Sequence, residues 1–316
     1  MLWLVGAGLM AQEYIRVLQE LNVDFKCIGR GKQTAEKCKQ ETKQDVFVGG
    51  LEKFLSKNLD NKCSHAIIAT NVESLFENCL LLLEFGVENI LLEKPGALKY
   101  SEILLLQNEA NKRNARVYIA YNRRFYASVL KAKDIIIRDG GVKSFCFNFT
   151  EWKHIIEKLD KSCMVKNKWF LCNSTHVVDL AFFLGGQPKE MTSYNANPLE
   201  WHPSGSSFGG SGITKKDTIF SYHANWNSPG RWGVEVFSEN YRCILQPLEE
   251  LYIQEKKSVM INTCKDINFI LDKKFKPGLY LQVKNFIDDN TENFCSLKEQ
   301  EVMFKYFYQI ANYKLD

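Results

Sequence analysis

Short apolar runs alternate with longer helix-like segments along the first 120 residues. The apolar runs have few polar interruptions, as in Ala66–Ala69, which is typical of strands covered on both faces. We expect strands at Leu2–Val5, Phe25–Ile28, Asp45–Val48, His65–Ala69, Asn89–Leu92 and Val117–Ala120. We expect helices between them, at Met10–Leu21, Gln33–Gln40, Leu51–Lys57, Glu73–Phe85 and Ser101–Asn114. Strands that alternate with helices predict a doubly wound parallel sheet of the α/β class.

The pattern changes after residue 120. Strand-like segments joined by short turns, such as Ser238–Asn240, are typical of antiparallel hairpins. Such strands are expected at Val142–Thr150, Thr218–Trp226, Gly233–Phe237, Arg242–Gln246 and Leu251–Gln254, with helices at Arg124–Arg138, Thr175–Leu184, Pro277–Asp288 and Ser296–Tyr313. The segment Asn197–Lys216 is rich in Gly, Ser and Pro and is expected to be a long loop, of the kind that often covers functional sites. We therefore predict two domains, 1–120 with the parallel sheet and 121–316 as an α+β domain with an open, mainly antiparallel sheet.

Composition narrows the class of protein without naming it. Of the 316 residues, 45% are hydrophobic and 25% are charged, as in ordinary globular proteins. Apolar runs such as Cys79–Leu83 are far shorter than the roughly 20 residues of a membrane span, and Met1 leads into a strand without the basic segment of a secretory signal. The net charge of +4 forms no basic stripe. We therefore expect neither a membrane nor a nucleic acid as partner, although a small anionic ligand remains compatible.

Ten cysteines are scattered along the chain without any C-x-x-C pair. Scattered thiols of this kind are typical of small buried side chains in a reducing cytoplasm. The histidines also lack metal-ligand spacing. We therefore expect a cytoplasmic protein without a bound metal.

A glycine-rich turn follows the first strand. Residues 6–11 read Gly-Ala-Gly-Leu-Met-Ala and fit the pattern G-x-G-x-x-A between a strand and a helix. Gly6 permits the tight turn, and Gly8 lets a pyrophosphate approach the backbone. The helix that opens with Leu9 and Met10 supplies amide donors and a partial positive charge to the phosphates. The turn predicts a dinucleotide cofactor.

The end of the second strand bears on the identity of that cofactor. NAD-selective folds place an acidic residue there to hold the ribose 2′-hydroxyl group. Here the strand ends in Gly29-Arg30-Gly31-Lys32, without a carboxylate. Gly29 leaves room, and Arg30 offers a planar fork to a 2′-phosphate. We infer NADP(H), with NAD as the alternative in which Arg30 and Lys32 are solvated charges.

Glu93-Lys94-Pro95-Gly96 ends the fifth strand, where strand ends face the cofactor in such sheets. With this motif in place, the sequence resembles the Gfo/Idh/MocA family, named after glucose–fructose oxidoreductase, inositol dehydrogenase and a protein of rhizopine catabolism. The resemblance extends over essentially the whole chain. It rests on Gly6–Gly8, Ala69–Asn71, Glu93–Pro95, Tyr121–Phe125 and His176–Asp179.

The resemblance implies a Rossmann domain, a substrate domain and reversible hydride transfer at a sugar or polyol carbon. It also implies that Lys94 binds and polarises the reacting oxygen, and that His176 is the general acid and base. An ammonium group stabilises negative charge on a carbonyl oxygen during reduction, and histidine exchanges protons near neutral pH. We expect the two residues to meet in the crevice between the domains. A homodimer or homotetramer formed through the open sheet is likewise implied.

Two departures from the family pattern affect the site. Many members have Asp four residues before the histidine, and this chain has Cys172 there, which cannot orient the imidazole as a carboxylate does. Asp179 lies three residues after His176 and shares its helix face, either to orient the ring or as a structural anchor. The usual Thr-Pro is Thr70-Asn71, a change that affects mainly the packing of the cofactor.

The remaining candidates are less specific. Asn122 is a candidate for contact with the nicotinamide or the substrate, and Arg123 and Arg124 for pairing with acids. Arg231 is equally compatible with a nucleotide phosphate and with an ordinary surface charge. Three tryptophans are candidates for stacking on a sugar, with core packing as the default: Trp152, Trp169 and Trp226. The expected cofactor contacts are Gly6, Gly8, Leu9, Met10, Gly29, Arg30, Thr70, Asn71, Glu93, Lys94 and Asn122. The expected substrate contacts are Lys94, Asn122, Trp152, Cys172, Asn173, His176, Asp179 and Arg231.

The leading hypothesis is an NADP(H)-dependent oxidoreductase that acts on a nucleotide-linked or amino sugar of surface-polysaccharide biosynthesis. The sugar-nucleotide part rests on resemblance, since Lys168–Ser174 looks like the same stretch of family members from such pathways. Two alternatives stay open. One is a regulator that has kept the fold and lost catalysis, and the other is a reductase of a non-sugar carbonyl compound.

Overall fold

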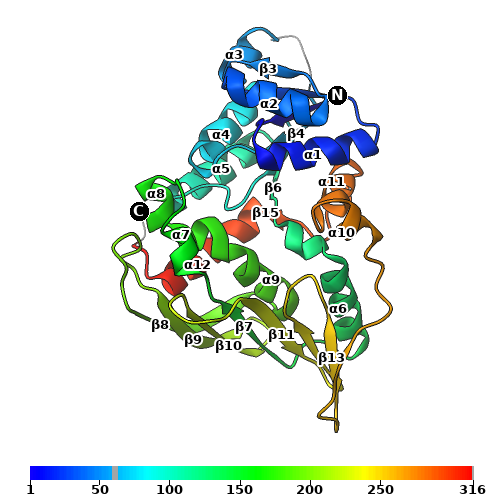
Figure 1. Cartoon of the computed structure of the whole chain (residues 1–316), viewed down its shortest axis with the longest axis vertical. Coiled ribbons are helices and arrows are strands. Elements are labelled where there is room, and N and C mark those ends of the chain that lie inside the picture. Colours follow the sequence, from blue (N-terminus) through cyan, green and yellow to red (C-terminus); the bar gives the residue numbers. More distant parts are fainter. Residues whose placement is uncertain (59–62, 315–316) are drawn as a thin grey trace. The chain divides into compact units, whose positions relative to one another are not determined.

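A computed structural model describes residues 1–58 and 63–314 (Figure 1). The described residues form two compact units, the first made of Met1–Asn122 and Leu271–Val302, and the second of Arg123–Ile270 and residues 303–314. This division differs from the expected one in the place of Leu271–Val302, which belongs with the first unit. The reason is local, because a short strand in this segment joins the first sheet and a helix of the segment packs on α1 (Leu9–Glu20).

The first unit is built on a seven-stranded sheet with the order β15-β6-β5-β4-β1-β2-β3. Six strands are parallel: β1 (Leu2–Val5), β2 (Phe25–Gly29), β3 (Val46–Val48), β4 (His65–Ile68), β5 (Asn89–Leu92) and β6 (Arg116–Ile119). The helices of this unit are α1, α2 (Lys32–Thr42), α3 (Gly50–Ser56), α4 (Leu75–Phe85), α5 (Tyr100–Lys112), α10 (Ile270–Lys274) and α11 (Leu279–Ile287). The central strands β1 and β5 are buried throughout. The predicted doubly wound sheet is confirmed, and its strand order reverses between β1 and β4, where such folds bind ligands at the carboxyl ends of the strands.

The second unit is built on an eight-stranded sheet with the order β14-β13-β12-β11-β7-β10-β9-β8, antiparallel except for the parallel pair of β7 and β10. The strands are β7 (Ser144–Phe149), β8 (Pro188–Ala196), β9 (Ser207–Thr214), β10 (Ile219–Asn225), β11 (Trp232–Phe237), β12 (Tyr241–Leu245), β13 (Tyr252–Glu255) and β14 (Ile261–Thr263). The helices are α6 (Ala127–Arg138), α7 (Lys153–Ile156), α8 (Cys163–Asn167) and α9 (Thr175–Gly185). The last helix, α12 (Leu297–Ala311), begins in the first unit and ends in the second. The predicted α+β unit with a mainly antiparallel sheet is confirmed.

Alternation along β7 and β10 gives this sheet one buried face. Phe145 and Phe147 on β7 stack on Phe220 and Tyr222 of β10, with ring centroids 5.3 Å apart in both pairs. Phe182 of α9 packs edge-on against the same layer, at 5.7 Å from Phe145. Helix α9 therefore covers this face of the sheet (Figure 1). The residues between these aromatics point to the other face and are at least partly exposed.

The expected loop at Asn197–Lys216 is wrong for Ser207–Thr214, because these residues form β9. Its glycines serve close packing. A Cβ atom at Gly210 would lie 2.4 Å from the Tyr222 ring, and one at Gly212 would lie 2.7 Å from the Phe220 ring. These positions therefore need glycine in a strand that crosses over large aromatic side chains.

Two further expectations concern the whole of the described chain. Within residues 1–58 and 63–314, no helix has both the length and the apolar character needed to cross a membrane. All ten cysteines are free, and six of them are buried with the apolar core: Cys27, Cys38, Cys63, Cys79, Cys243 and Cys295.

Candidate functional site

The turn between β1 and α1 has the geometry that phosphate binding requires. Gly6 has φ of +132°, and a Cβ atom there would lie 2.3 Å from the backbone oxygen of Ala69, so only glycine fits. At Gly8, in contrast, a Cβ atom would meet no heavy atom within 4 Å. Gly8 precedes the first turn of α1 without a side-chain cap. Leu9, in that first turn, is 77% exposed, while Met10 is half-buried. An open helix N-terminus beside an open glycine fits a dinucleotide pyrophosphate.

The end of β2 is where the cofactor ribose would lie. Gly29 is buried, and a Cβ atom there would lie 2.9 Å from Val46 and 3.1 Å from Ala7. Its small size therefore serves packing inside the unit, while the cofactor contact expected of Gly29 stays a prediction. Arg30 is exposed and forms no ion pair with the residues that the structure describes. Lys32 is also exposed, 3.9 Å from Glu36.

The Glu-Lys-Pro turn after β5 is tied to α1 by a partly buried hydrogen bond. The Tyr14 hydroxyl donates to Glu93 Oε1 at 2.8 Å, and Tyr14 has no exposed surface. Burial raises the pKa of Glu93, and the Tyr14 hydrogen bond and the charges of Lys94 and Lys276 oppose that rise. Burial and the neighbouring carboxylate raise the pKa of Tyr14 well above its usual value. Glu93 therefore fixes the turn that carries Lys94, and no sequence pattern had indicated Tyr14 as its partner.

The same turn is held from its other end by α12. The Lys94–Pro95 peptide bond is cis, and the Pro95 oxygen accepts a hydrogen bond from Gln300 Nε2 at 2.8 Å. Gln300 is fully buried and also donates to the Tyr121 hydroxyl at 3.1 Å. The half-buried Lys94 thus projects from a backbone that is fixed at both ends, at the carboxyl edge of the parallel sheet.

In the second unit, His176 is the second residue of α9 and is 8% exposed. A π-helical turn, Phe170–Ser174, leads directly into this helix, and such wide turns are frequent at functional sites. The His176 ring centroid lies 6.3 Å from that of Trp232. Three residues further on, Asp179 forms a buried two-point ion pair with Arg124, at 2.6 and 2.8 Å. Of the two roles expected for Asp179, this arrangement favours the structural anchor.

A buried carboxylate lies beside this turn and is absent from the sequence-based candidates. Glu151 follows β7 and is 2% exposed. Its Oε1 accepts hydrogen bonds from Asn173 Nδ2 at 2.9 Å and Ser174 Oγ at 2.8 Å, and Arg231 Nη1 lies 3.4 Å from its Oε2. Burial raises the pKa of Glu151, and these partners and Trp232 oppose the rise. The signal in the sequence was a single acidic residue at the end of a strand, which carries no motif.

Comparison with known proteins identifies the first unit. Residues 2–121 match the model of the Gfo/Idh/MocA family, described as an oxidoreductase family with an NAD-binding Rossmann fold. Residues 2–121 therefore carry the NAD-binding Rossmann domain of this oxidoreductase family. The expectation from the sequence motifs is confirmed at this level, and so is an NAD(P)-dependent enzyme. No curated protein matches the sequence.

Solved structures show that the whole chain shares its fold with several dehydrogenases and oxidoreductases. Levoglucosan dehydrogenase, in complex with NADH and L-sorbose, is 14% identical with a TM-score of 0.77, over 98% of this chain and 95% of its own. UDP-N-acetylglucosamine 3-dehydrogenase from Acidithiobacillus ferrooxidans is 13% identical with a TM-score of 0.73, over 98% and 96%. A protein of Desulfitobacterium hafniense, assigned as an NADPH-dependent oxidoreductase, is 12% identical with a TM-score of 0.80, over 98% and 94%. At such identities the likeness shows the fold, and the neighbours differ in the cofactor that they are described with.

The remaining cofactor candidates lie at the ends of β4 and β6. Thr70 is half-buried and Asn71 is exposed, in the turn before the short helix Val72–Ser74. Asn122 is buried, and its Nδ2 donates to the Pro277 oxygen at 2.9 Å. The segment with Lys276 and Pro277 is thereby fastened to the end of β6. This places a second lysine near Glu93, which the sequence had not indicated, while the cofactor contacts of Thr70, Asn71 and Asn122 stay predictions.

The substrate candidates of the second unit divide by exposure. Trp169 and Trp226 are buried, and Trp226 packs against Trp201 with parallel rings 6.0 Å apart, as the core alternative predicted. Trp152 is 46% exposed. Cys172 is half-buried within the π-helical turn, where its N–H donates to the Lys168 oxygen.

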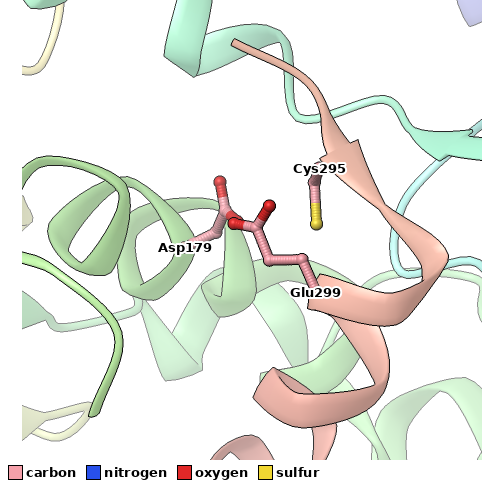
Figure 2. A group of neighbouring side chains, drawn as sticks. All are labelled: Asp179, Cys295 and Glu299. Carbon is pink, nitrogen blue, oxygen red and sulfur yellow. The ribbon is translucent and has the colours of Figure 1, made fainter. Parts of the chain in front are cut away.

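Figure 2 shows Asp179 on α9, together with Cys295 on β15 (Cys295–Ser296) and Glu299 in the first turn of α12. Each has a partner within its own unit. Asp179 pairs with Arg124, the Cys295 thiol donates to Gln300 Oε1 at 3.6 Å, and the Glu299 N–H donates to Ser296 Oγ at 3.2 Å. Cys295 and Glu299 thus fasten the passage from strand to helix that supports Lys94.

Proposed function

We propose that the protein is an NADP(H)-dependent oxidoreductase that transfers a hydride to or from a carbon of a sugar. We further propose that this sugar is nucleotide-linked or an amino sugar, used in surface-polysaccharide biosynthesis. The observation that carries the cofactor choice is the exposed Arg30 at the end of β2, in a segment without a carboxylate. The neighbours described as acting on UDP-N-acetylglucosamine or levoglucosan support the sugar.

The residues of the chain divide the chemistry between them. A bound nicotinamide ring supplies or accepts the hydride. Lys94 holds the reacting oxygen and stabilises its negative charge during reduction. His176 exchanges the proton of that oxygen with solvent. The Tyr14–Glu93 and Gln300–Pro95 hydrogen bonds fix the backbone of Lys94. Lys94 therefore loses little further conformational entropy when the substrate binds.

Replacing Lys94 with Ala tests the proposed reaction. We expect turnover of a panel of keto-sugars with NADPH to fall by a factor of about a hundred or more, because one preorganised charge contact to the developing oxyanion is lost. Lys112→Ala is the matched control, an exposed lysine of α5 in the same unit. Unchanged turnover of the Lys94 variant would remove this residue from the mechanism. Binding of NADPH without turnover of any carbonyl compound by the unaltered protein would favour the regulator instead.

The cofactor choice has its own test in Arg30→Ala. A charge-assisted hydrogen bond contributes about 1.5–3 kcal/mol, so the Kd for NADPH should rise by roughly 10- to 150-fold while the Kd for NADH stays unchanged. Lys37→Ala, on the exposed side of α2, is the control. Equal effects on NADPH and NADH would contradict a contact between Arg30 and the 2′-phosphate.

We also propose that copies of the chain associate as a homodimer or homotetramer through the open face of the second sheet. Two large hydrophobic side chains support this, Tyr194 of β8 at 72% and Ile219 of β10 at 65% exposure. The molar mass measured by light scattering, as the protein elutes from a size-exclusion column, tests this proposal. A monomer at micromolar concentration would contradict it. We place the enzyme in the cytoplasm, because ten free thiols suit a reducing compartment.

A further inference from the structure

Arg231 is held in an unusual position for a surface arginine. It directly precedes β11, and its side chain is 46% exposed. The guanidinium carbon lies 4.9 Å from the ring centroid of Trp152 and 4.7 Å from that of Trp232. The Trp152 ring is itself fixed, because its N–H donates to the Gly230 oxygen at 2.9 Å. Two indole rings therefore orient a planar cation that still reaches solvent.

The carboxylate that faces Arg231 is already occupied by other partners. Glu151 Oε1 accepts from Asn173 and Ser174, and the remaining oxygen lies 3.4 Å from Arg231 Nη1. This is longer than the 2.7–2.9 Å of a good charge-assisted hydrogen bond. Glu151 thus attracts the guanidinium without closing a two-point pair with it. Among the residues that the structure describes, most donors of Arg231 are therefore left to a further acceptor.

The charges near this guanidinium favour an anion as that acceptor. Arg123 lies 4.6 Å from the centroid of the same Trp232 ring, and its field acts with that of Arg231. The carboxylates that act on this pair are Glu151 and, on Arg123, Glu249. Glu151 is buried and has its own hydrogen bonds. The ring centroid of His176 lies 6.3 Å from that of Trp232. This places the two arginines beside the residue that is predicted to exchange the proton.

We propose that Arg231 is the receptor for an anionic group on the sugar, braced by Trp152 and Glu151. The substrate class is therefore a sugar that carries a phosphate or a carboxylate group, both of which match the fork of a guanidinium. This inference rests on the proposed function and makes its substrate more specific. Arg231 acts in it as a specificity-determining residue and takes no part in hydride or proton transfer.

Isothermal titration calorimetry tests the proposal by measuring the Kd of matched probes for the full chain in the presence of NADPH. UDP-N-acetylglucosamine is compared with N-acetylglucosamine for the phosphate source, and D-glucuronate with D-glucose for the carboxylate source. We expect one anionic probe to bind at least about tenfold more tightly than its neutral partner. Arg231→Gln should abolish this preference and leave the neutral probe and the Kd of NADPH unchanged. Arg231→Lys should keep part of it, because it retains the charge without the fork.

Arg242→Gln is the matched control, since Arg242 also pairs with a glutamate and lies over an aromatic ring of the same sheet. It should keep the full preference for the anionic probe. The inference is overturned if no anionic probe is preferred by the unaltered protein, if Arg231→Gln keeps the preference, or if Arg242→Gln loses it equally. If Arg231→Gln does not fold, Arg231→Lys decides, and an unreduced preference in that variant also counts against the fork. Equal turnover of neutral and anionic sugars would contradict this inference but not the proposed function. Failure to bind either NADPH or NADH would contradict the proposed function.

Discussion

His202 offers a sharp test of the electrostatics of the second unit, because it is buried as a neutral ring. Nδ1 lies 2.6 Å from the Gly205 oxygen, which can only accept, so Nδ1 carries the proton. Nε2, at 2.8 Å, therefore accepts from the Tyr313 hydroxyl. A second proton would put a charge where the ring has no exposed surface, and Trp226 packs 4.8 Å from it. Burial accordingly lowers the pKa of His202 to about 4.

The magnitude follows from proton linkage. The unfolded chain binds a proton at this histidine near pH 6.5 and the folded chain only near pH 4, so the unfolded state holds more protons between these values. His202 therefore makes a contribution to the free energy of unfolding that is fully present above pH 6.5 and is lost as the pH falls towards 4. At about 1.36 kcal/mol for each pH unit, roughly 3 kcal/mol is lost between pH 7.5 and pH 4.

Urea unfolding of the unaltered protein and of His202→Gln, at pH 7.5 and at pH 4, measures this contribution. The variant is expected to be less stable at pH 7.5, since it loses the ring contacts, but its stability should change by about 3 kcal/mol less between the two values. The carboxyl groups titrate equally in both proteins, so their contributions to the pH dependence cancel in the difference. His223→Gln, at an exposed position of β10, should keep the full dependence. Equal pH dependence in His202→Gln and the unaltered protein would refute the buried neutral ring.

Three further predictions concern stability, and thermal or urea unfolding checks each. Asp179→Asn leaves the buried Arg124 without its counter-charge, so we expect a loss of about 3–5 kcal/mol, and a loss below about 1 kcal/mol would contradict the buried pair. Gly210→Ala forces a methyl group against the Tyr222 ring, and overpacking of this kind should cost about 1–3 kcal/mol. Hydrogen bonds from neighbouring groups lower the pKa of Asp139 to about 2, so its contribution is present above about pH 4 and is lost as the pH falls to 2. Asp139→Asn should therefore show a weaker decline of stability across that range.

The parallel sheet could be predicted from the sequence because its central strands are continuous apolar runs. Such a run is buried on both faces, so its ends coincide with the ends of the strand within a residue or two, as at β1 and β5. The turn at Gly6 could be predicted for a similar reason. Its backbone conformation excludes other residues, and this requirement is visible in a single sequence.

The omissions have different physical causes. Strand β9 was missed because glycine signals both flexibility and close packing, and only the rings of Phe220 and Tyr222 distinguish the two. Strand β15 has two residues, too few for any periodicity, although it brings the whole segment from Leu271 into the first unit. Glu151 was missed because one acidic residue after a strand acquires meaning only through the partners that the fold brings to it.

Three arginines of the second unit each face a carboxylate, and their geometries separate structural from binding roles. Arg124 meets Asp179 in a closed, buried pair, and Arg242 meets Glu235 through two nitrogens at 2.6 and 2.9 Å. Arg231 alone among these three approaches its carboxylate at 3.4 Å while two indoles hold it flat. Burying Glu151 costs free energy that so loose a pair offsets only in part, and Asn173 and Ser174 offset more of it. The arrangement therefore stabilises the position of Arg231 more than it neutralises its charge, which is what a receptor for an incoming anion requires.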